Sequence, residues 1–228
     1  MIKRLALALL LAVSAIFGST ACSEPSLAQS ITSSMRSIKQ DSELALYRQV
    51  GLVTFKVLTD HGTGSAVAVS HDRLVTAAHV VMDSKTLIPF DNIKIYNDVT
   101  GNPYVMDCQI GLVDVKNDLA YLVPVLSLPH WTTYEPQYVK WGDLVVACGH
   151  PMGEDSAVVT SGRVADLSAH RGYMLHSAQT FFGNSGGPLF LKVGDSYKLI
   201  AVAHMVYGDY TVLSLASNPK TFAKFLNR

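Results

Sequence analysis

The sequence has little cysteine, no excess of charge of either sign, and no long hydrophobic run beyond residues 5–17. Three cysteines in 228 residues do not build a disulfide framework, and the histidines show neither the H-E-x-x-H pattern nor a Cys/His spacing typical of zinc sites. Basic and acidic residues balance at 18 each, which does not favour a nucleic acid or an anionic membrane surface as partner. We therefore expect no metal site and no nucleic-acid binding.

The composition instead suits a globular protein, because 49% of the residues are hydrophobic and only 16% are charged. Cys108 and Cys148 both lie in apolar, strand-like stretches. Sequence alone leaves open whether they pair, since a disulfide needs the two chains within reach. We favour two buried free thiols.

The N-terminus has the pattern of an export signal. Lys3 and Arg4 precede LALALLLAVSAIF, a run that suits a signal peptide and is short for a membrane-spanning helix. Two ways of processing this signal stay open, namely cleavage near Ser26–Ala28 or lipidation of Cys22. A lipobox before a lipidated cysteine normally has Leu where this chain has Ser19. We expect a signal peptide over residues 1–21 and an exported chain that is periplasmic, secreted or tethered to the membrane through Cys22.

Residues 22–42 are rich in Ser and Gln and poor in bulky apolar side chains, so they predict a flexible N-terminal segment. From residue 43 to 228 about a dozen short Val-rich runs follow, separated by Gly, Pro, Asp or Asn. This pattern predicts one all-β domain of antiparallel sheets, closed as barrels or packed as a sandwich.

One helix is expected, at the C-terminal end of the chain. Asn218 is the expected N-cap and Pro219 the first helical residue. The apolar face of this helix would consist of Phe222, Phe225 and Leu226.

Three separated motifs carry residues for nucleophilic chemistry. His79 lies towards the end of the apolar segment LVTAAHVV, Asp118 precedes the run LAYLV, and Ser185 lies in the glycine-rich segment QTFFGNSGGPLF. A serine hydroxyl attacks well only when a base takes its proton, and that base needs a carboxylate to fix its tautomer. The glycines allow tight backbone turns, so that the N–H groups of Gly183 and Ser185 can face a developing oxyanion.

The motifs TAAHVV, NDLAYL and GNSGGPL resemble the triad motifs of chymotrypsin-fold (trypsin-like) serine peptidases. The resemblance is strongest to the bacterial group that includes the HtrA peptidases and the glutamyl endopeptidases, and it extends to GTGSAVAV at 62–69, GHPMG at 149–153 and TSGRV at 160–164. It implies two six-stranded antiparallel β-barrels with the active site between them. No PDZ domain follows, so the cages and allostery of HtrA peptidases are not expected.

The same resemblance implies an endopeptidase that cleaves protein or peptide substrates through an acyl-enzyme and needs no cofactor. His79 would be the general base, Asp118 its orienting carboxylate and Ser185 the nucleophile. Gly183 and Ser185 would provide the oxyanion hole.

A substrate pocket is also implied by the resemblance. Thr180 and His204 match positions that hold a Glu or Gln side chain in glutamyl endopeptidases and related viral enzymes. No Asp lies near Gln179, which speaks against an Arg/Lys pocket. The alternative is that His204 is a structural histidine of the barrel.

Two other functions stay open at this stage. The segment GNSGG also satisfies the nucleophile elbow of α/β-hydrolases, but that fold needs the order Ser, acid, His and a helix after the serine. The chain could also be a catalytically silent or latent binding protein on a peptidase fold, with residues 23–50 as an inhibitory arm.

Overall fold

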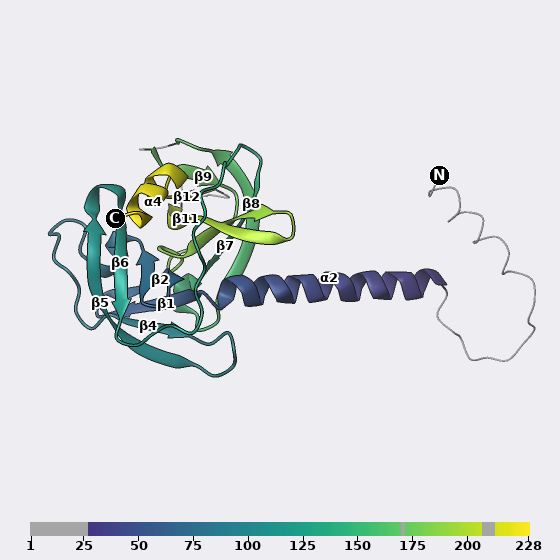
Figure 1. Cartoon of the computed structure of the whole chain (residues 1–228), viewed down its shortest axis with the longest axis horizontal. Coiled ribbons are helices and arrows are strands. Elements are labelled where there is room, and N and C mark those ends of the chain that lie inside the picture. Colours follow the sequence, from purple (N-terminus) through teal and green to yellow (C-terminus); the bar gives the residue numbers. More distant parts are fainter. Residues whose placement is uncertain (1–26, 170–171, 207–212) are drawn as a thin grey trace, which may run out of the picture. The chain divides into compact units, whose positions relative to one another are not determined.

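The computed structural model describes residues 27–169, 172–206 and 213–228 (Figure 1). The predicted signal peptide and Cys22 lie outside these residues. By internal contacts the chain divides into two compact units, with the boundary between Ser42 and Glu43. Within the described residues, no helix has the length and apolar character needed to span a membrane.

Helix α2 (Leu27–Gly51) occupies the segment for which composition predicted a flexible tether. The tether is therefore corrected to a helix for residues 27–42. The physical reason is that the helix has no proline, and no glycine before Gly51, while Ser and Gln each cost well under 1 kcal/mol in a helix. Near the end of α2, Val50 is buried and its carbonyl accepts a hydrogen bond from Thr54 Oγ1 at 2.7 Å.

The first half of the second unit is a closed antiparallel barrel with the strand order β1-β2-β3-β6-β5-β4. Short helix α3 (Ala78–Val81) follows β3, and the 3-10 turn η1 (Val115–Asn117) precedes β6. Buried apolar side chains, among them Phe55 and Leu74, fill its interior. Its strands are β1 (Thr54–Thr59), β2 (Gly62–Ser70), β3 (Arg73–Thr76), β4 (Lys94–Asn97), β5 (Tyr104–Asp114) and β6 (Leu119–Pro124).

The second half forms another closed antiparallel barrel, with the order β10-β11-β12-β9-β8-β7. The 3-10 turn η2 (Pro151–Gly153) lies between its first two strands. The predicted class, all-β with two six-stranded barrels, is thus confirmed. The strands are β7 (Leu144–Gly149), β8 (Val158–Asp166), β9 (Met174–His176), β10 (Pro188–Val193), β11 (Ser196–Val206) and β12 (Ser214–Ala216).

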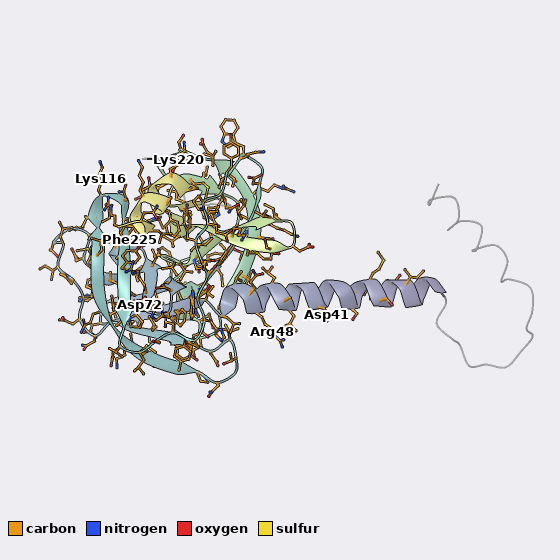
Figure 2. The ribbon with its side chains drawn as sticks, in the orientation of Figure 1. Asp41, Arg48, Asp72, Lys116, Lys220 and Phe225 are labelled. Atoms are coloured by element: carbon orange, nitrogen blue, oxygen red, sulfur yellow. The ribbon has the colours of Figure 1, made fainter. Side chains whose placement is uncertain are left out.

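The predicted C-terminal helix is also confirmed, as α4 (Pro219–Leu226). Asn218 caps it by accepting a hydrogen bond from Lys220 N at 3.0 Å. Phe225, labelled in Figure 2, is buried and stacks on Tyr121 of β6 with ring centroids 4.5 Å apart. Helix α4 therefore ties the end of the chain to the first barrel.

Another apolar cluster joins the two barrels. It combines Val67 and Leu119 from the first barrel with Phe190 and Val202 from the second, and includes the buried face of α4. Since such a cluster excludes water and packs densely, it fixes the facing sides of the barrels against each other. The loops that carry the three motifs extend from these facing sides.

Both cysteines of the domain are free and buried, as the sequence analysis favoured. Cys108 lies in β5 and Cys148 in β7, so they belong to different barrels. Burial raises the pKa of each thiol to about 12, which keeps the sulfur protonated and unreactive.

His176 gives the fold a testable pH dependence. Burial in the second barrel lowers its pKa from 6.5 to about 4, because the charged imidazolium is disfavoured there. The unfolded chain therefore binds the proton more readily, so stability is complete above pH 6.5 and is lost as the pH falls towards 4.

We predict that His176→Gln removes about 3 kcal/mol of the stability difference between pH 7 and pH 4. Urea unfolding of both proteins at the two pH values measures this difference. The same pH dependence in wild type and variant would contradict the burial argument.

Candidate active site

The first two motif residues meet at the edge of the first barrel. His79 lies in α3, and its Nδ1 is 2.7 Å from Asp118 Oδ2. The backbone N–H of His79 also donates to the other carboxylate oxygen, Asp118 Oδ1, at 2.9 Å. His79 thus contacts both oxygens of the Asp118 carboxylate, one through its main chain and the other through its side chain.

A tight turn aims Asp118 at this position. Asp118 follows η1 in the left-handed conformation, with φ 53° and ψ 49°, which is uncommon for a residue with a side chain. Asp114 begins the turn and accepts a hydrogen bond from Asn117 N at 3.1 Å. Arg228, the last residue, holds Asp114 with an ion pair at 2.8 Å. The strained backbone is therefore supported from the C-terminal end of the chain.

The carboxylate of Asp118 stays ionised although it is partly buried. Burial alone would raise its pKa, but hydrogen bonds from His204 and His79 outweigh this effect and hold the pKa well below the ordinary range. A charged acceptor is therefore present at neutral pH.

His204 does not face an open substrate pocket, which is the place that the resemblance implied for it. Its side chain is fully buried, and its Nδ1 is 2.7 Å from Asp118 Oδ2. This placement does not support the pocket assignment of His204, because its Nδ1 faces the carboxylate of Asp118 and no part of the ring is exposed. The observed position agrees better with the alternative, a structural histidine of the barrel. Its hydrogen-bond partner is nevertheless Asp118, a residue of the candidate site.

Ser185 is linked to the same histidine. Its Oγ donates to the backbone carbonyl of His204 at 2.8 Å. The structure therefore connects all three motif residues, Asp118 to His79 directly and Ser185 to Asp118 through His204. In this rotamer the hydroxyl does not donate to His79.

The backbone before Ser185 turns sharply, as the glycines predict. Gly183 has φ +95°, and a Cβ there would lie 2.3 Å from the carbonyl oxygen of His150. Within the described part of the chain, the N–H groups of Gly183 and Ser185 have no hydrogen-bond acceptor. These two unpartnered donors, one on each side of Asn184, are available to donate to a developing oxyanion.

Ser65 of β2 holds this loop from the opposite barrel, and the sequence analysis did not identify it. Its fully buried Oγ donates to Gly183 O at 2.7 Å and accepts from His150 N at 2.9 Å. Its backbone N–H donates to Ser185 O at 2.8 Å. A serine inside an otherwise apolar strand, GSAVAV, was the available signal, because a buried hydroxyl needs partners.

Thr180, the second predicted pocket residue, is also buried and engaged. Its Oγ1 donates to Ser214 Oγ at 2.8 Å, and no described contact links it to His204. Large apolar side chains are exposed beside the serine loop instead. Phe181 and Phe182 are 56% and 83% exposed, and Met152, whose N–H donates to Phe182 O, is 76% exposed.

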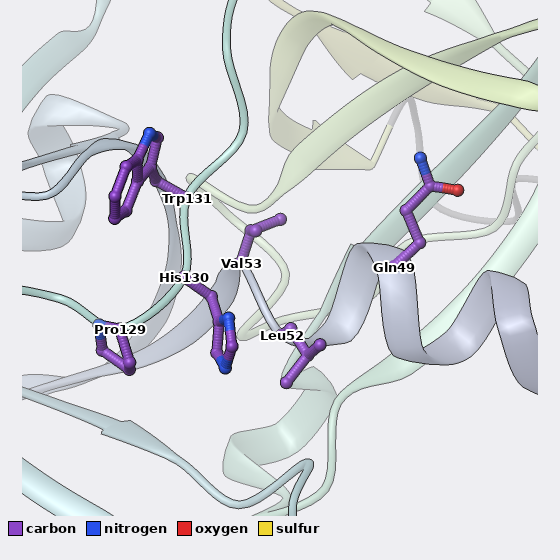
Figure 3. A pocket seen from close by; sticks show the side chains of 6 residues that line it. All are labelled: Gln49, Leu52, Val53, Pro129, His130 and Trp131. Carbon is purple, nitrogen blue, oxygen red and sulfur yellow. The ribbon is translucent and has the colours of Figure 1, made fainter.

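A hollow of about 300 Å³ lies elsewhere on the domain, between the end of α2 and the chain that follows β6 (Figure 3). None of the motif residues borders it. Its lining consists of Gln49, Leu52, Val53, Pro129, His130 and Trp131.

Two six-stranded barrels with His, Asp and Ser motifs on their facing sides define the chymotrypsin-fold class. The family model "Trypsin-like peptidase domain" matches residues 63–202, more than half of the chain. The chain therefore belongs to the trypsin-like peptidase domain family. None of the curated proteins compared with the chain is significantly similar to it in sequence.

Solved structures share the fold at low sequence identity. An inactive form of a mutant of Rv3671c from M. tuberculosis has a TM-score of 0.62 at 20% identity, over 78% of this chain and 86% of its own. The serine endoprotease from Yersinia pestis has a TM-score of 0.67 at 20% identity, over 82% and 65%. The MamO protease domain from Magnetospirillum magneticum has 0.64 at 18%, over 78% and 98%.

The role of Ser65 can be tested by removing its hydroxyl. We predict that Ser65→Ala lowers the free energy of unfolding by about 1–3 kcal/mol, because Gly183 O loses its donor and His150 N its acceptor in a buried place. The control is Ser70→Ala on the same strand, whose hydroxyl bonds only to the side chain of Asp72 at the surface. Equal unfolding energies for the two variants would contradict the bridging role.

Proposed function

We propose that the protein is an exported serine endopeptidase in which Ser185 attacks a peptide carbonyl and His79 and Asp118 assist. The observation that carries the proposal is the His79–Asp118 contact beside a serine loop with two unpartnered N–H groups. Family membership supports peptidase activity in general, and the site geometry supports the particular residues.

The proton path follows from the contacts of His79. Because Nδ1 faces Asp118, Nε2 is the nitrogen that takes the Ser185 proton as Oγ bonds to the substrate carbonyl carbon. The carbonyl oxygen becomes an oxyanion that accepts hydrogen bonds from Gly183 N and Ser185 N. His79 then gives the proton to the leaving amine. A water molecule next attacks the acyl carbon while His79 takes one of its protons, and His79 passes that proton to Ser185 Oγ as the carboxylic acid product leaves.

Ser185 must rotate about its Cα–Cβ bond before it reacts, since its hydroxyl donates to His204 O in the present rotamer. Such a rotation is a small step, because single side chains exchange rotamers on fast timescales. The resting hydrogen bond is therefore compatible with the proposed reaction.

The preference for Glu or Gln before the scissile bond stays a prediction, and the placement of Thr180 and His204 does not support it. Both side chains are buried and bonded to other protein groups. A peptide library tests the preference directly. Equal cleavage after Glu, Gln and other residues would exclude it.

Export is proposed from the N-terminal sequence. The basic and apolar segments of residues 1–17 favour secretion to the periplasm or beyond, or a tether through lipidated Cys22. The mass of the mature protein isolated from the membrane and from the medium separates these forms.

The second candidate is a catalytically silent or latent peptidase-fold protein that binds peptides. The observation in its favour is the absent hydrogen bond between Ser185 and His79 in the described structure. It predicts peptide binding that does not depend on Ser185.

We predict that a fluorophosphonate probe labels the wild-type protein at Ser185, and that Ser185→Ala abolishes both labelling and peptide hydrolysis. Loss of the nucleophile removes the acyl-enzyme step, so any residual rate should be lower by several orders of magnitude. Ser168→Ala, at an exposed loop serine, is the control and should behave as wild type. Hydrolysis retained by Ser185→Ala would reject the proposed nucleophile, and an inert wild type would favour the silent protein.

A further inference from the structure

His204 lies at an irregularity of strand β11. Ala203 pairs with Ala216 of β12, whereas Met205 pairs with Leu215, so His204 is the extra residue of a β-bulge. A bulge frees the backbone groups of the extra residue from the ladder and redirects its side chain. The freed carbonyl of His204 is the acceptor of the Ser185 hydroxyl.

The side chain of His204 shares one oxygen with the candidate base. Nδ1 of His79 and Nδ1 of His204 each lie 2.7 Å from Asp118 Oδ2. An ionised carboxylate only accepts hydrogen bonds, so each Nδ1 must carry a proton. The other ring nitrogen of His204, Nε2, is buried without a hydrogen-bond partner among the described residues. Its ring packs 4.8 Å from the ring of Tyr173.

The same three side chains have the composition of a zinc site, since their ligand atoms lie within 4.8 Å of one another. Hydrogen bonding fits the geometry better. A metal would need the lone pair of each Nδ1, which would move the proton of His204 to Nε2, where no described acceptor is present. Both Nδ1 atoms also stand at hydrogen-bond distance from a single oxygen.

We propose that His204 is a positioning residue that locks the two halves of the active site together. The inference rests on the proposed function. Asp118 and His79 belong to the first barrel, and Ser185 belongs to the second. His204 contacts both halves, because its ring donates to Asp118 and its carbonyl accepts from Ser185. It thereby fixes the carboxylate that orients His79 relative to the strand beside the nucleophile.

A pair of variants of similar shape isolates the Nδ1 donor. In His204→Asn the side-chain amide N–H₂ can stand near the place of Nδ1 and donate to Asp118, whereas His204→Leu has no donor. We expect His204→Leu to lower kcat by on the order of 10- to 100-fold with little change in KM, since a donor to a buried charge is lost. His204→Asn should recover most of that loss.

The kinetic outcomes separate this proposal from its alternatives. Equal kcat values for wild type and His204→Leu, both properly folded, would overturn it. So would a raised KM or an altered cleavage preference at unchanged kcat, which would return His204 to the substrate pocket. An inactive wild type would instead contradict the proposed function.

A measurement that does not need activity tests the contact itself. In ¹⁵N-labelled protein, NMR spectra of the histidine rings should show a proton on Nδ1 of His204, with Asp118→Asn changing its Nδ1 signal. An Nδ1 without a proton, or a signal unaffected by Asp118→Asn, would overturn the proposal even if the enzyme were inactive. Addition of Zn²⁺ without change in these signals would exclude the metal site.

Discussion

The structure depends most on a single, partly buried carboxylate, that of Asp118. Three N–H groups converge on it, from the backbone and ring of His79 and from the ring of His204. These donors keep the carboxylate charged inside a folded protein, where an unpaired charge would be very costly. A fixed negative charge in turn dictates which nitrogen of His79 carries the proton and which faces the nucleophile. Placing the charge there requires an uncommon left-handed backbone conformation at Asp118. The ion pair of Asp114 with Arg228 stabilises the turn that contains it.

The second constraint is that the site is divided between two barrels, so contacts that cross the boundary decide its geometry. The apolar cluster between the barrels buries side chains from both of them. Two polar residues then fix the relative positions of the site residues across the boundary. Ser65 of the first barrel holds the loop of Gly183 and Ser185, and His204 of the second barrel holds Asp118. Both are fully or almost fully buried, so bulk water does not offer their side chains an alternative hydrogen-bond partner.

The sequence predicted those parts of the fold and of the candidate site that a short, continuous stretch of residues encodes. Short Val-rich strands predicted an all-β domain, and the resemblance of its motifs to chymotrypsin-fold peptidases implied the two barrels. Asn218–Pro219 predicted the start of the last helix. The motifs around His79, Asp118 and Ser185 predicted the residues that the structure connects. It was not informative where the decisive feature is a contact between distant strands. The bulge at His204 depends on the register of β11 against β12, and no local pattern encodes that register. The helical N-terminal segment was missed because a Ser- and Gln-rich composition disfavours a packed core but does not exclude a helix.

The most direct test of the account is a crystal structure of the protein with a peptide aldehyde or boronic acid bound. We expect a covalent bond from Ser185 Oγ, the adduct oxygen about 3 Å from the N–H groups of Gly183 and Ser185, and both imidazoles still on Asp118. An adduct whose oxygen points away from these N–H groups would contradict the account, as would a ring of His204 turned from the carboxylate.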